Sequence, residues 1–278
     1  MQSKLYIVGT PIGNLGDISP RAAETLDSVD FIAAEDTRVS IKLLNHLGIK
    51  KPLVSYYDHN KTTSGEKILA RILGGENCAL VTDAGMPAVS DPGYELVKIC
   101  ADAGVEVIVI PGPCALIAAL AGSALPPGRF TFEGFLSTAK QSRTRHLEEV
   151  KSEKRTMIFY EAPHKLLSTL RDMLPAFGDR EITVARELTK IHEEFLRTTI
   201  SGAIEHFTEI PARGELVLVI AGAPEEEMEK ASPEEALKIV AAYRDEGKSL
   251  KEAAELAAAE TNLSKNELYN LYIKTRTK

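Results

Sequence analysis

Short apolar runs alternate along the first half of the chain with longer stretches whose apolar positions recur at helical spacing. The runs are expected to be strands at residues 5–8, 31–34, 53–56, 78–82 and 105–110. Amphipathic stretches such as residues 21–26 and 94–104 lie between them and are typical of helices. Strands that alternate with helices indicate βα units on a mostly parallel sheet, so the fold class is α/β.

A second series of apolar runs follows residues 130–135. Further strands are expected at residues 155–160, 180–186, 193–200 and 214–222. No full helix separates each neighbouring pair, so the second sheet is expected to be mixed. We place the boundary between the two halves near Pro126 and Pro127, where a Pro-Pro-Gly stretch interrupts the apolar helix expected at residues 114–123.

After Gly222 the composition changes to the acidic stretch EEEMEKASPEE and then to three helical stretches rich in Ala, Leu, Glu and Lys. The short turns DEGKS and TNLS between these stretches resemble those of a helix-turn-helix. The pattern predicts an N-terminal α/β domain at 1–126, a second α/β domain at 127–222, and an acidic linker with a small helical tail at 223–278.

Composition narrows the class of protein. A chain of 278 residues with 44% hydrophobic and 26% charged residues is typical of a soluble globular protein. No apolar run approaches the roughly 20 residues of a membrane span, and the start lacks the apolar core of a signal peptide, so a cytoplasmic protein is expected. The net charge of -7 disfavours broad nucleic-acid binding, so any RNA contact must be a local basic patch. Neither Cys nor His residues show metal-ligand spacing, so we expect no metal site.

The loops at the carboxyl ends of the first-half strands are the candidate sites of chemistry. They read GTPIGNLGD, EDTR, DAGMPAVSDPG and PGPCA. The glycines of the first loop do not have GxGxxG spacing, which disfavours a dinucleotide fold. In the third loop, Gly85 and Gly93 alternate with Pro87 and Pro92, which suits a rigid backbone approached closely by a small ligand and equally suits a chain of tight turns.

Local helix signals offer plain structural readings for several polar residues. Ser19 and Pro20 are expected to begin a helix, and Asp36 or Thr37 is suited to cap the next one. Asp83 is suited to form a turn. Capping and turn formation are therefore alternatives to a functional role for these side chains.

Eight motifs in order resemble one family. They are LYIVGTPIGNLGDIS, AAEDTR, DAGMPAVSDPGYELV, PGPCALIAAL, FEGFLS, FYEAPHKL, ARELTKIHEE and GELVLVI. Together they resemble the 16S ribosomal RNA cytidine 2′-O-methyltransferase branch of the class III (tetrapyrrole methylase-like) S-adenosylmethionine-dependent methyltransferases, over roughly residues 4–222. The resemblance implies a two-domain class III fold, S-adenosyl-L-methionine in the cleft between the domains, a homodimer, and methylation of a decoding-centre cytidine ribose in 16S rRNA, within the small ribosomal subunit.

The resemblance also implies which residues contact the cofactor. They are Pro11, Gly13, Asp83, Gly85, Met86, Val89, Ser90, Asp91, Pro113, Ala115, Tyr160, Leu188 and Leu216. The chain departs from the family pattern at Met86, Ser137 and Lys165, where Thr, Pro and Arg are expected. Met86 loses a polar group, although a thioether and its long apolar stem can still pack there.

Methyl transfer from a sulfonium needs positioning and desolvation of the reactants, and a ribose hydroxyl also needs a group that accepts or delocalises its proton. The catalytic candidates in the motif loops are Glu35, Asp36, Arg38, Lys190 and Glu193, and Asp83 is a further proton acceptor. The RNA-binding candidates are Lys140, Arg143, Arg145 and Arg186. For each of these residues a cap, a turn or a solvated surface charge is an equal alternative.

Two other functions remain open at this stage. A corrin or porphyrin methylase would share the fold but carry a GxGxGD-type first loop, whereas this chain has GTPIGNLGD. A regulator would bind nucleic acid through the C-terminal helices and show no turnover. The acidic stretch beside those helices makes strong binding of the tail to DNA less favourable.

Overall fold

The computed structural model describes residues 3–224 and 231–276. The chain forms two compact units, Met1–Ala223 and Pro224–Lys278, and each is described by itself. Most of the stretch expected to be an acidic linker, residues 225–230, lies outside the described residues.

The first sheet confirms the predicted parallel βα arrangement. Its strands are β1 (Lys4–Val8), β2 (Phe31–Ala34), β3 (Leu53–Ser55), β4 (Cys78–Val81) and β5 (Glu106–Ile110). All neighbours are parallel, in the order β3-β2-β4-β1-β5. Strands β2 and β4 are buried at every position, as expected for parallel strands covered on both faces.

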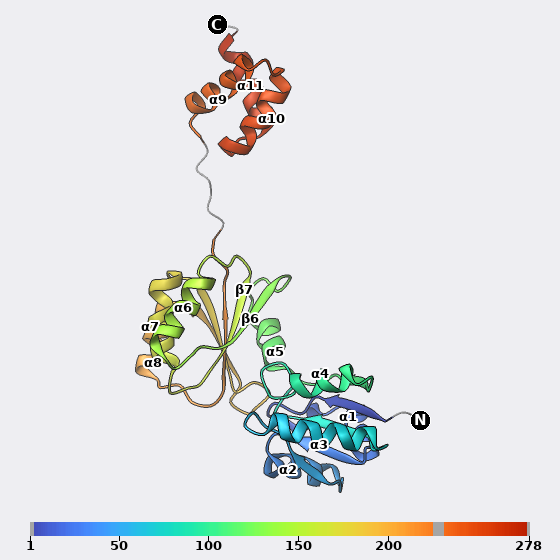
Figure 1. Ribbon diagram of the computed structural model, residues 1–278. Coiled ribbons are helices and arrows are strands. Elements are labelled where there is room, and N and C mark those ends of the chain that lie inside the picture. The colour runs from blue at the N-terminus through green and yellow to red at the C-terminus, as the bar shows by residue number, and fades with distance from the viewer. Residues whose placement is uncertain (1–2, 225–230, 277–278) are drawn as a thin grey trace. The chain divides into compact units, whose positions relative to one another are not determined.

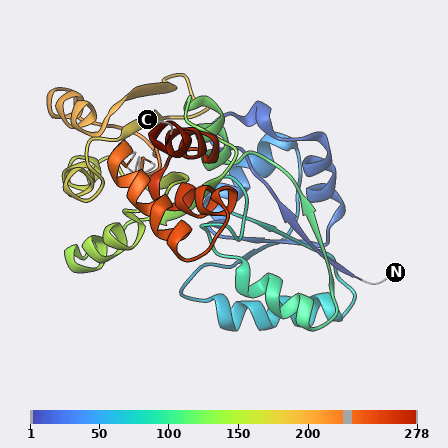
Figure 2. The same ribbon diagram turned by 90° about the horizontal axis from the view of Figure 1, so that it is seen from above.

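Helices cover both faces of this sheet. They are α1 (Pro20–Ser28) and α2 (Thr37–Leu47) on one face, and α3 (Lys61–Leu73) and α4 (Tyr94–Asp102) on the other (Figure 2). A 3₁₀ turn, η1 (Leu15–Asp17), precedes α1. The Ser19 side chain accepts a hydrogen bond from the Ala22 amide with Pro20 in the first turn, and Asp36 caps α2, so both predicted helix starts are confirmed.

The second sheet is mixed, as predicted. Its strands are β6 (Phe130–Phe135), β7 (Thr156–Glu161), β8 (Glu181–Arg186), β9 (Glu194–Thr199) and β10 (Leu216–Ile220). The order is β6-β7-β10-β8-β9, with β6 and β7 parallel and the other neighbours antiparallel. Helices α6 (Lys140–Val150), α7 (Leu166–Phe177) and α8 (Ile200–Glu209) cover one face (Figure 1).

Helix α5 (Ala115–Gly122) covers the other face of the second sheet. Its residues Leu116 and Leu120 share one buried cluster with Ile158 of β7 and Val219 of β10. This helix precedes the expected boundary at residues 126 and 127, yet it packs on the strands that follow the boundary. Helix α5 therefore belongs to the second sheet by its packing, and the exact limits of the two α/β domains stay a prediction.

The second unit is a small helical bundle, the helical extension predicted from sequence. Its helices are α9 (Pro233–Asp245), α10 (Leu250–Thr261) and α11 (Lys265–Arg276). Its core includes Val240, Ala254 and Leu268. Ser232 and Ser249 begin α9 and α10 with complete capping boxes. In the described part of the chain, every helix is too short or too polar to cross a membrane.

Candidate cofactor and substrate site

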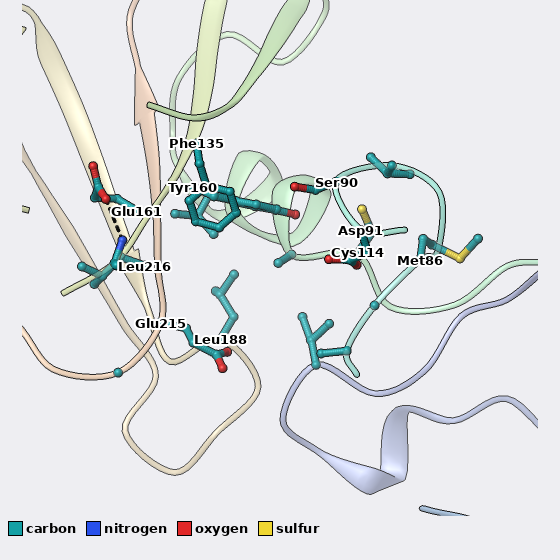
Figure 3. Close-up of a pocket in the computed structure, with 18 of the residues that line it drawn as sticks. Met86, Ser90, Asp91, Cys114, Phe135, Tyr160, Glu161, Leu188, Glu215 and Leu216 are labelled. Atoms are coloured by element: carbon teal, nitrogen blue, oxygen red, sulfur yellow. Dashed lines mark hydrogen bonds between the residues drawn. The ribbon is translucent and has the colours of Figure 1, made fainter. Parts of the chain in front are cut away.

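A cavity of about 390 Å³ lies between the loops of the first sheet and the strands of the second (Figure 3). This volume falls in the roughly 300–1,000 Å³ range of small-molecule sites. The first half contributes Ile12, Ala84, Gly85, Met86, Val89, Ser90, Asp91, Cys114 and Ala115. The second half contributes Phe135, Tyr160, Glu161, Ala162, Pro163, Leu188, Gly214, Glu215, Leu216 and Val217.

Most residues expected to contact the cofactor come together around this cavity. Those that line it are Gly85, Met86, Val89, Ser90, Asp91, Ala115, Tyr160, Leu188 and Leu216. The remaining expected residues, Pro11, Gly13, Asp83 and Pro113, belong to the same loops but do not line it. Cys114 lies between the expected Pro113 and Ala115, whereas sequence reasoning missed Phe135, Glu161 and Glu215. All three lie inside quoted motifs, and Glu161 and Glu215 are direct neighbours of the expected Tyr160 and Leu216.

The loop after β4 is held against the loop after β1 by paired backbone hydrogen bonds. The Thr10 amide donates to the Gly85 carbonyl at 3.0 Å, and the Gly85 amide donates to the Thr10 carbonyl at 3.1 Å. Gly85 has a φ of 88°, and Ala88 in the same loop has a φ of 65°. A non-glycine residue in the left-handed region costs energy, and such residues cluster at ligand sites. The strained backbone therefore marks this loop as a candidate ligand cradle.

A close backbone approach beneath the cavity explains two further glycines. A β-carbon on Gly112 would lie 2.8 Å from the α-carbon of Gly9, and one on Gly9 would lie 2.6 Å from the sulfur of Met86. The thioether of Met86 thus packs over Gly9, in the position where the family pattern has Thr. Both glycines are required because any side chain would push the two loops apart.

The carboxylates of Glu35, Asp83 and Asp91 lie in the loops at the carboxyl edge of the first sheet. The Asp36 amide donates to Oδ1 of Asp83 at 3.1 Å, and the Asp83 amide donates to Oε2 of Glu35 at 3.4 Å. Burial raises the pKa of Glu35, of Asp83 and of Asp91, and of these Asp91 lines the cavity. Raised pKa values make these groups better proton acceptors than exposed carboxylates.

Asp36 and Arg38 form a local pair at the start of α2. The Asp36 carboxylate accepts from the Arg38 amide at 2.8 Å and lies 2.6 Å from the guanidinium. Hydrogen bonds from Arg38 lower the pKa of Asp36 to about 2. Asp36 is therefore a helix cap and a poor proton acceptor, while the Arg38 side chain remains 88% exposed to solvent.

Lys190 and Glu193 stabilise a tight loop after β8. The Lys190 ammonium lies 2.9 Å from Oε1 of Glu187 and 3.1 Å from Oε2 of Glu215. Burial acts to lower the pKa of Lys190, but hydrogen bonds to the two carboxylates outweigh it and raise the pKa. The Thr189 amide donates to Oε2 of Glu193 at 2.6 Å. Lys190 is therefore a protonated cation and cannot accept the ribose proton, and Glu193 braces the loop.

The basic residues predicted to contact RNA differ in their exposure to solvent and in their ion pairing. Arg143 donates to Oδ2 of Asp172 at 2.6 Å, and its side chain is only 14% exposed. Arg145 is 78% exposed and lies 3.9 Å from Glu149, and Lys140 is exposed at the start of α6. Arg186 pairs with Glu194 at 2.9 Å and lines a second cavity with His206 and Arg213. The basic face of α6 therefore rests on Lys140 and Arg145.

Within the described ranges 3–224 and 231–276, no group of His, Cys, Asp and Glu side chains has the arrangement of a metal site.

The chain is similar to known proteins over most of its length. Residues 4–204 match the tetrapyrrole (corrin/porphyrin) methylase family. A Synechocystis protein named ribosomal RNA small subunit methyltransferase I is 51% identical, over 96% of each chain. The Bacillus subtilis protein of that name is 47% identical, over 96% of this chain and 93% of its own. The Thermotoga maritima protein of that name is 51% identical, over 79% of this chain but 98% of its own.

Solved structures share the fold at low identity. A diphthine synthase aligns with a TM-score of 0.63 and 14% identity, over 79% of this chain and 90% of that one. A uroporphyrin-III-C-methyltransferase from Thermus thermophilus aligns with a TM-score of 0.57 and 16% identity, over 80% of this chain and 95% of that one. Identities this low establish the shared architecture alone.

Proposed function

The chain belongs to the tetrapyrrole (corrin/porphyrin) methylase family and uses S-adenosylmethionine, and from this premise we propose that it methylates the ribose 2′-hydroxyl of a decoding-centre cytidine in 16S ribosomal RNA. The observation that carries the proposal is the match to the Synechocystis ribosomal RNA methyltransferase, which spans 96% of both chains at 51% identity. The corrin or porphyrin alternative has weaker support, because the tetrapyrrole methylase noted above shares only 16% identity.

The cavity fits a cofactor with a flat base and a charged amino-acid end. Gly85 has no side chain and leaves its backbone open to the cavity, while Leu188 and Leu216 supply apolar contacts. Ser90 and Asp91 add polar groups at the same wall. When bound, the cofactor supplies the electrophilic methyl group, and we propose that the cavity residues hold it in the orientation for an in-line displacement.

The proton of the ribose hydroxyl needs a nearby acceptor. We propose that the carboxylates at the carboxyl edge of the first sheet fill this role, with Asp91 at the cavity and Glu35 and Asp83 behind it. Burial raises the pKa of all three, which suits a group that must take a proton during the reaction. Lys190 keeps its proton and is paired with Glu187 and Glu215, so its proposed role is to fix the loop.

RNA binding is assigned to local basic surfaces, since the net charge of the chain is -7. We propose that Lys140 and Arg145 of α6, with Arg186 and Arg38, contact phosphates of the small ribosomal subunit. We also propose that the active protein is a homodimer.

A transfer assay tests the proposed reaction. Purified protein and methyl-labelled S-adenosylmethionine are incubated with small ribosomal subunits from cells that lack the gene, or with uroporphyrinogen as the alternative acceptor. We expect label in the subunits, released by nuclease digestion as 2′-O-methylcytidine. Label in the tetrapyrrole, or in a base instead of a ribose, would contradict the proposal.

A further inference from the structure

Strand β6 contains a β-bulge just before it reaches the cavity. Phe132 pairs with Ile158 and Gly134 pairs with Phe159, so Glu133 is an extra residue that pairs with neither. Gly134 has a φ of 65°, a left-handed conformation that favours glycine. Bulges bend a strand and redirect the side chains that follow, and they are frequent beside active sites.

The bulge changes the direction of Phe135. In a regular strand, residues 132 and 135 would point to opposite faces, because side chains alternate. Here both rings contact the same residue: the ring centroids of Phe132 and Phe135 lie 5.0 and 5.4 Å from that of Tyr160. The extra residue therefore brings Phe135 onto the face of the sheet that borders the cavity.

The two phenylalanines differ in their exposure. Phe132 is half-buried against the cluster that α5 forms with the second sheet. Phe135 lines the cavity and is 58% exposed (Figure 3). Val89 also lines the cavity and is 55% exposed, and apolar surface gathered at a small-molecule site points to a ligand that covers it.

Tyr160 packs against Phe135 and is itself held in place by a hydrogen bond. Its hydroxyl oxygen accepts a hydrogen bond from the Leu116 amide at 3.2 Å, at the start of α5. Burial raises the pKa of Tyr160 to about 12, so the phenol stays neutral and the contact does not change near neutral pH. The extra residue of the bulge is also anchored, since Oε2 of Glu133 lies 3.1 Å from Nε2 of His146 in α6.

We propose that Phe135 is the platform on which the base of the target nucleotide stacks while its ribose lies at the cavity. This inference rests on the proposed function, because it requires RNA as the substrate. Unpaired RNA bases are commonly bound by stacking on aromatic side chains, and a ribose inside a folded subunit becomes reachable when its base is turned out. Helix α6 begins at the exposed Lys140, shortly after Phe135 in the chain, so a basic side chain follows the proposed platform closely.

Two matched substitutions separate stacking from packing. Phe135→Leu removes the exposed ring, and Phe132→Leu removes a ring from the same strand that also contacts Tyr160 but does not line the cavity. Phe135→Trp keeps a flat ring. For each variant, kcat and KM are measured with small subunits from cells that lack the gene, and the affinity for S-adenosylmethionine is measured by isothermal titration.

Loss of one stacked base predicts a fall in kcat/KM of about tenfold or more for Phe135→Leu, carried mainly by KM for the subunit. Phe135→Trp should stay within about threefold of the unaltered protein, as expected when a stacking surface is kept. The affinity for S-adenosylmethionine should be unchanged in Phe135→Leu and in Phe135→Trp. Phe132→Leu should lower the melting temperature while its KM for the subunit stays near that of the unaltered protein.

Three results would overturn the inference. Unchanged KM in Phe135→Leu would show that no base rests on the ring. A parallel loss of cofactor affinity would assign the ring to the adenine of S-adenosylmethionine instead. Equal effects of Phe135→Leu and Phe132→Leu on KM would show that both act through the position of Tyr160. Failure of the unaltered protein to methylate subunits at all would reject the proposed function itself, a distinct outcome.

Discussion

The aliphatic stem of Lys190 lies directly over the α-carbon of Gly13. A β-carbon on Gly13 would lie 2.6 Å from Cγ of Lys190, while the Lys190 ammonium is held by Glu187 and Glu215. Gly13 belongs to the first loop of the chain, and Lys190 follows a strand of the second sheet. This contact fixes one wall of the cleft relative to the other.

Gly13→Ala should therefore destabilise the protein by about 1–3 kcal/mol, as overpacking does. Part of this cost comes from the φ of 157° at Gly13 and from Thr189 Oγ1 at 2.9 Å, and the rest from Lys190. Chemical denaturation measures the effect, and Lys190→Ala provides the test of cause. In the Lys190→Ala background, adding Gly13→Ala should cost clearly less, because the stem that it would strike is gone. Additive effects of the two substitutions would show that the contact is not under compression.

Substitution of Gly112 or Gly85 should weaken cofactor binding. Gly112→Val must push against the backbone of Gly9, and Gly85→Val must adopt a φ of 88° that Val strongly disfavours. We expect the dissociation constant for S-adenosylmethionine to rise at least about tenfold in each, measured by isothermal titration. Gly128→Ala is the control, since a β-carbon there meets nothing within 4 Å. Equal cofactor affinity in all three variants would reject this account of the cleft.

Removing the charge of Glu35 and removing that of Asp36 should change the melting temperature at pH 7 in opposite directions. Burial raises the pKa of Glu35, so its charge opposes folding as the pH rises, and Glu35→Gln should increase the melting temperature at pH 7 by about 1–3 °C. Hydrogen bonds from Arg38 lower the pKa of Asp36 to about 2, so its charge favours folding above the ordinary Asp pKa, and Asp36→Asn should decrease the melting temperature at pH 7.

Both differences should shrink on acidification, for Glu35→Gln by about pH 4 and for Asp36→Asn between about pH 4 and pH 2. Asn remains a good helix cap, so the Asp36→Asn effect reports the ion pair and not the cap. Melting curves recorded from pH 2 to pH 8 check both signs, and shifts of stability in the same direction for the two substitutions at pH 7 would be the contrary result.

On α6, charge removal should separate RNA binding from stability. Lys140→Ala with Arg145→Ala should weaken binding to small subunits and reduce its dependence on salt, with the melting temperature little changed. Arg143→Ala should instead cost about 1.5–3 kcal/mol, because its hydrogen bond to Asp172 is largely shielded from water. An unaltered salt dependence in the double variant would leave Lys140 and Arg145 as a solvated surface.

We propose that the helical unit docks RNA, because its last helix carries the basic residues Lys274 and Arg276. A protein truncated after Ala223 should fold and bind S-adenosylmethionine normally, because the remaining residues form a compact unit of their own. The subunit concentration for half-maximal methylation should rise on truncation. Insoluble protein, or kinetics identical to the full chain, would reject the docking role.

The periodic parts of the fold could be predicted because each signal is local. Two series of short apolar runs predicted the strands of the two sheets, and Ser19 and Asp36 marked helix starts beside them. The partners of charged side chains could not be predicted, since Asp172 meets Arg143 only through the packing of α7 on α6. The exposure of Phe135 could not be predicted either, because it depends on a bulge that appears only when β6 pairs with β7. The position of α5 depends on its packing against the second sheet, which the local sequence does not encode.

A map of ribose methylation in ribosomal RNA, from cells with the gene, without it, and carrying the Gly112→Val variant in its place, tests the proposed reaction in the cell. We expect one 2′-O-methylcytidine in the decoding centre of 16S rRNA to be lost without the gene. It should return with the unaltered gene and return poorly with the variant. A methylation map that is identical with and without the gene would contradict the proposed reaction.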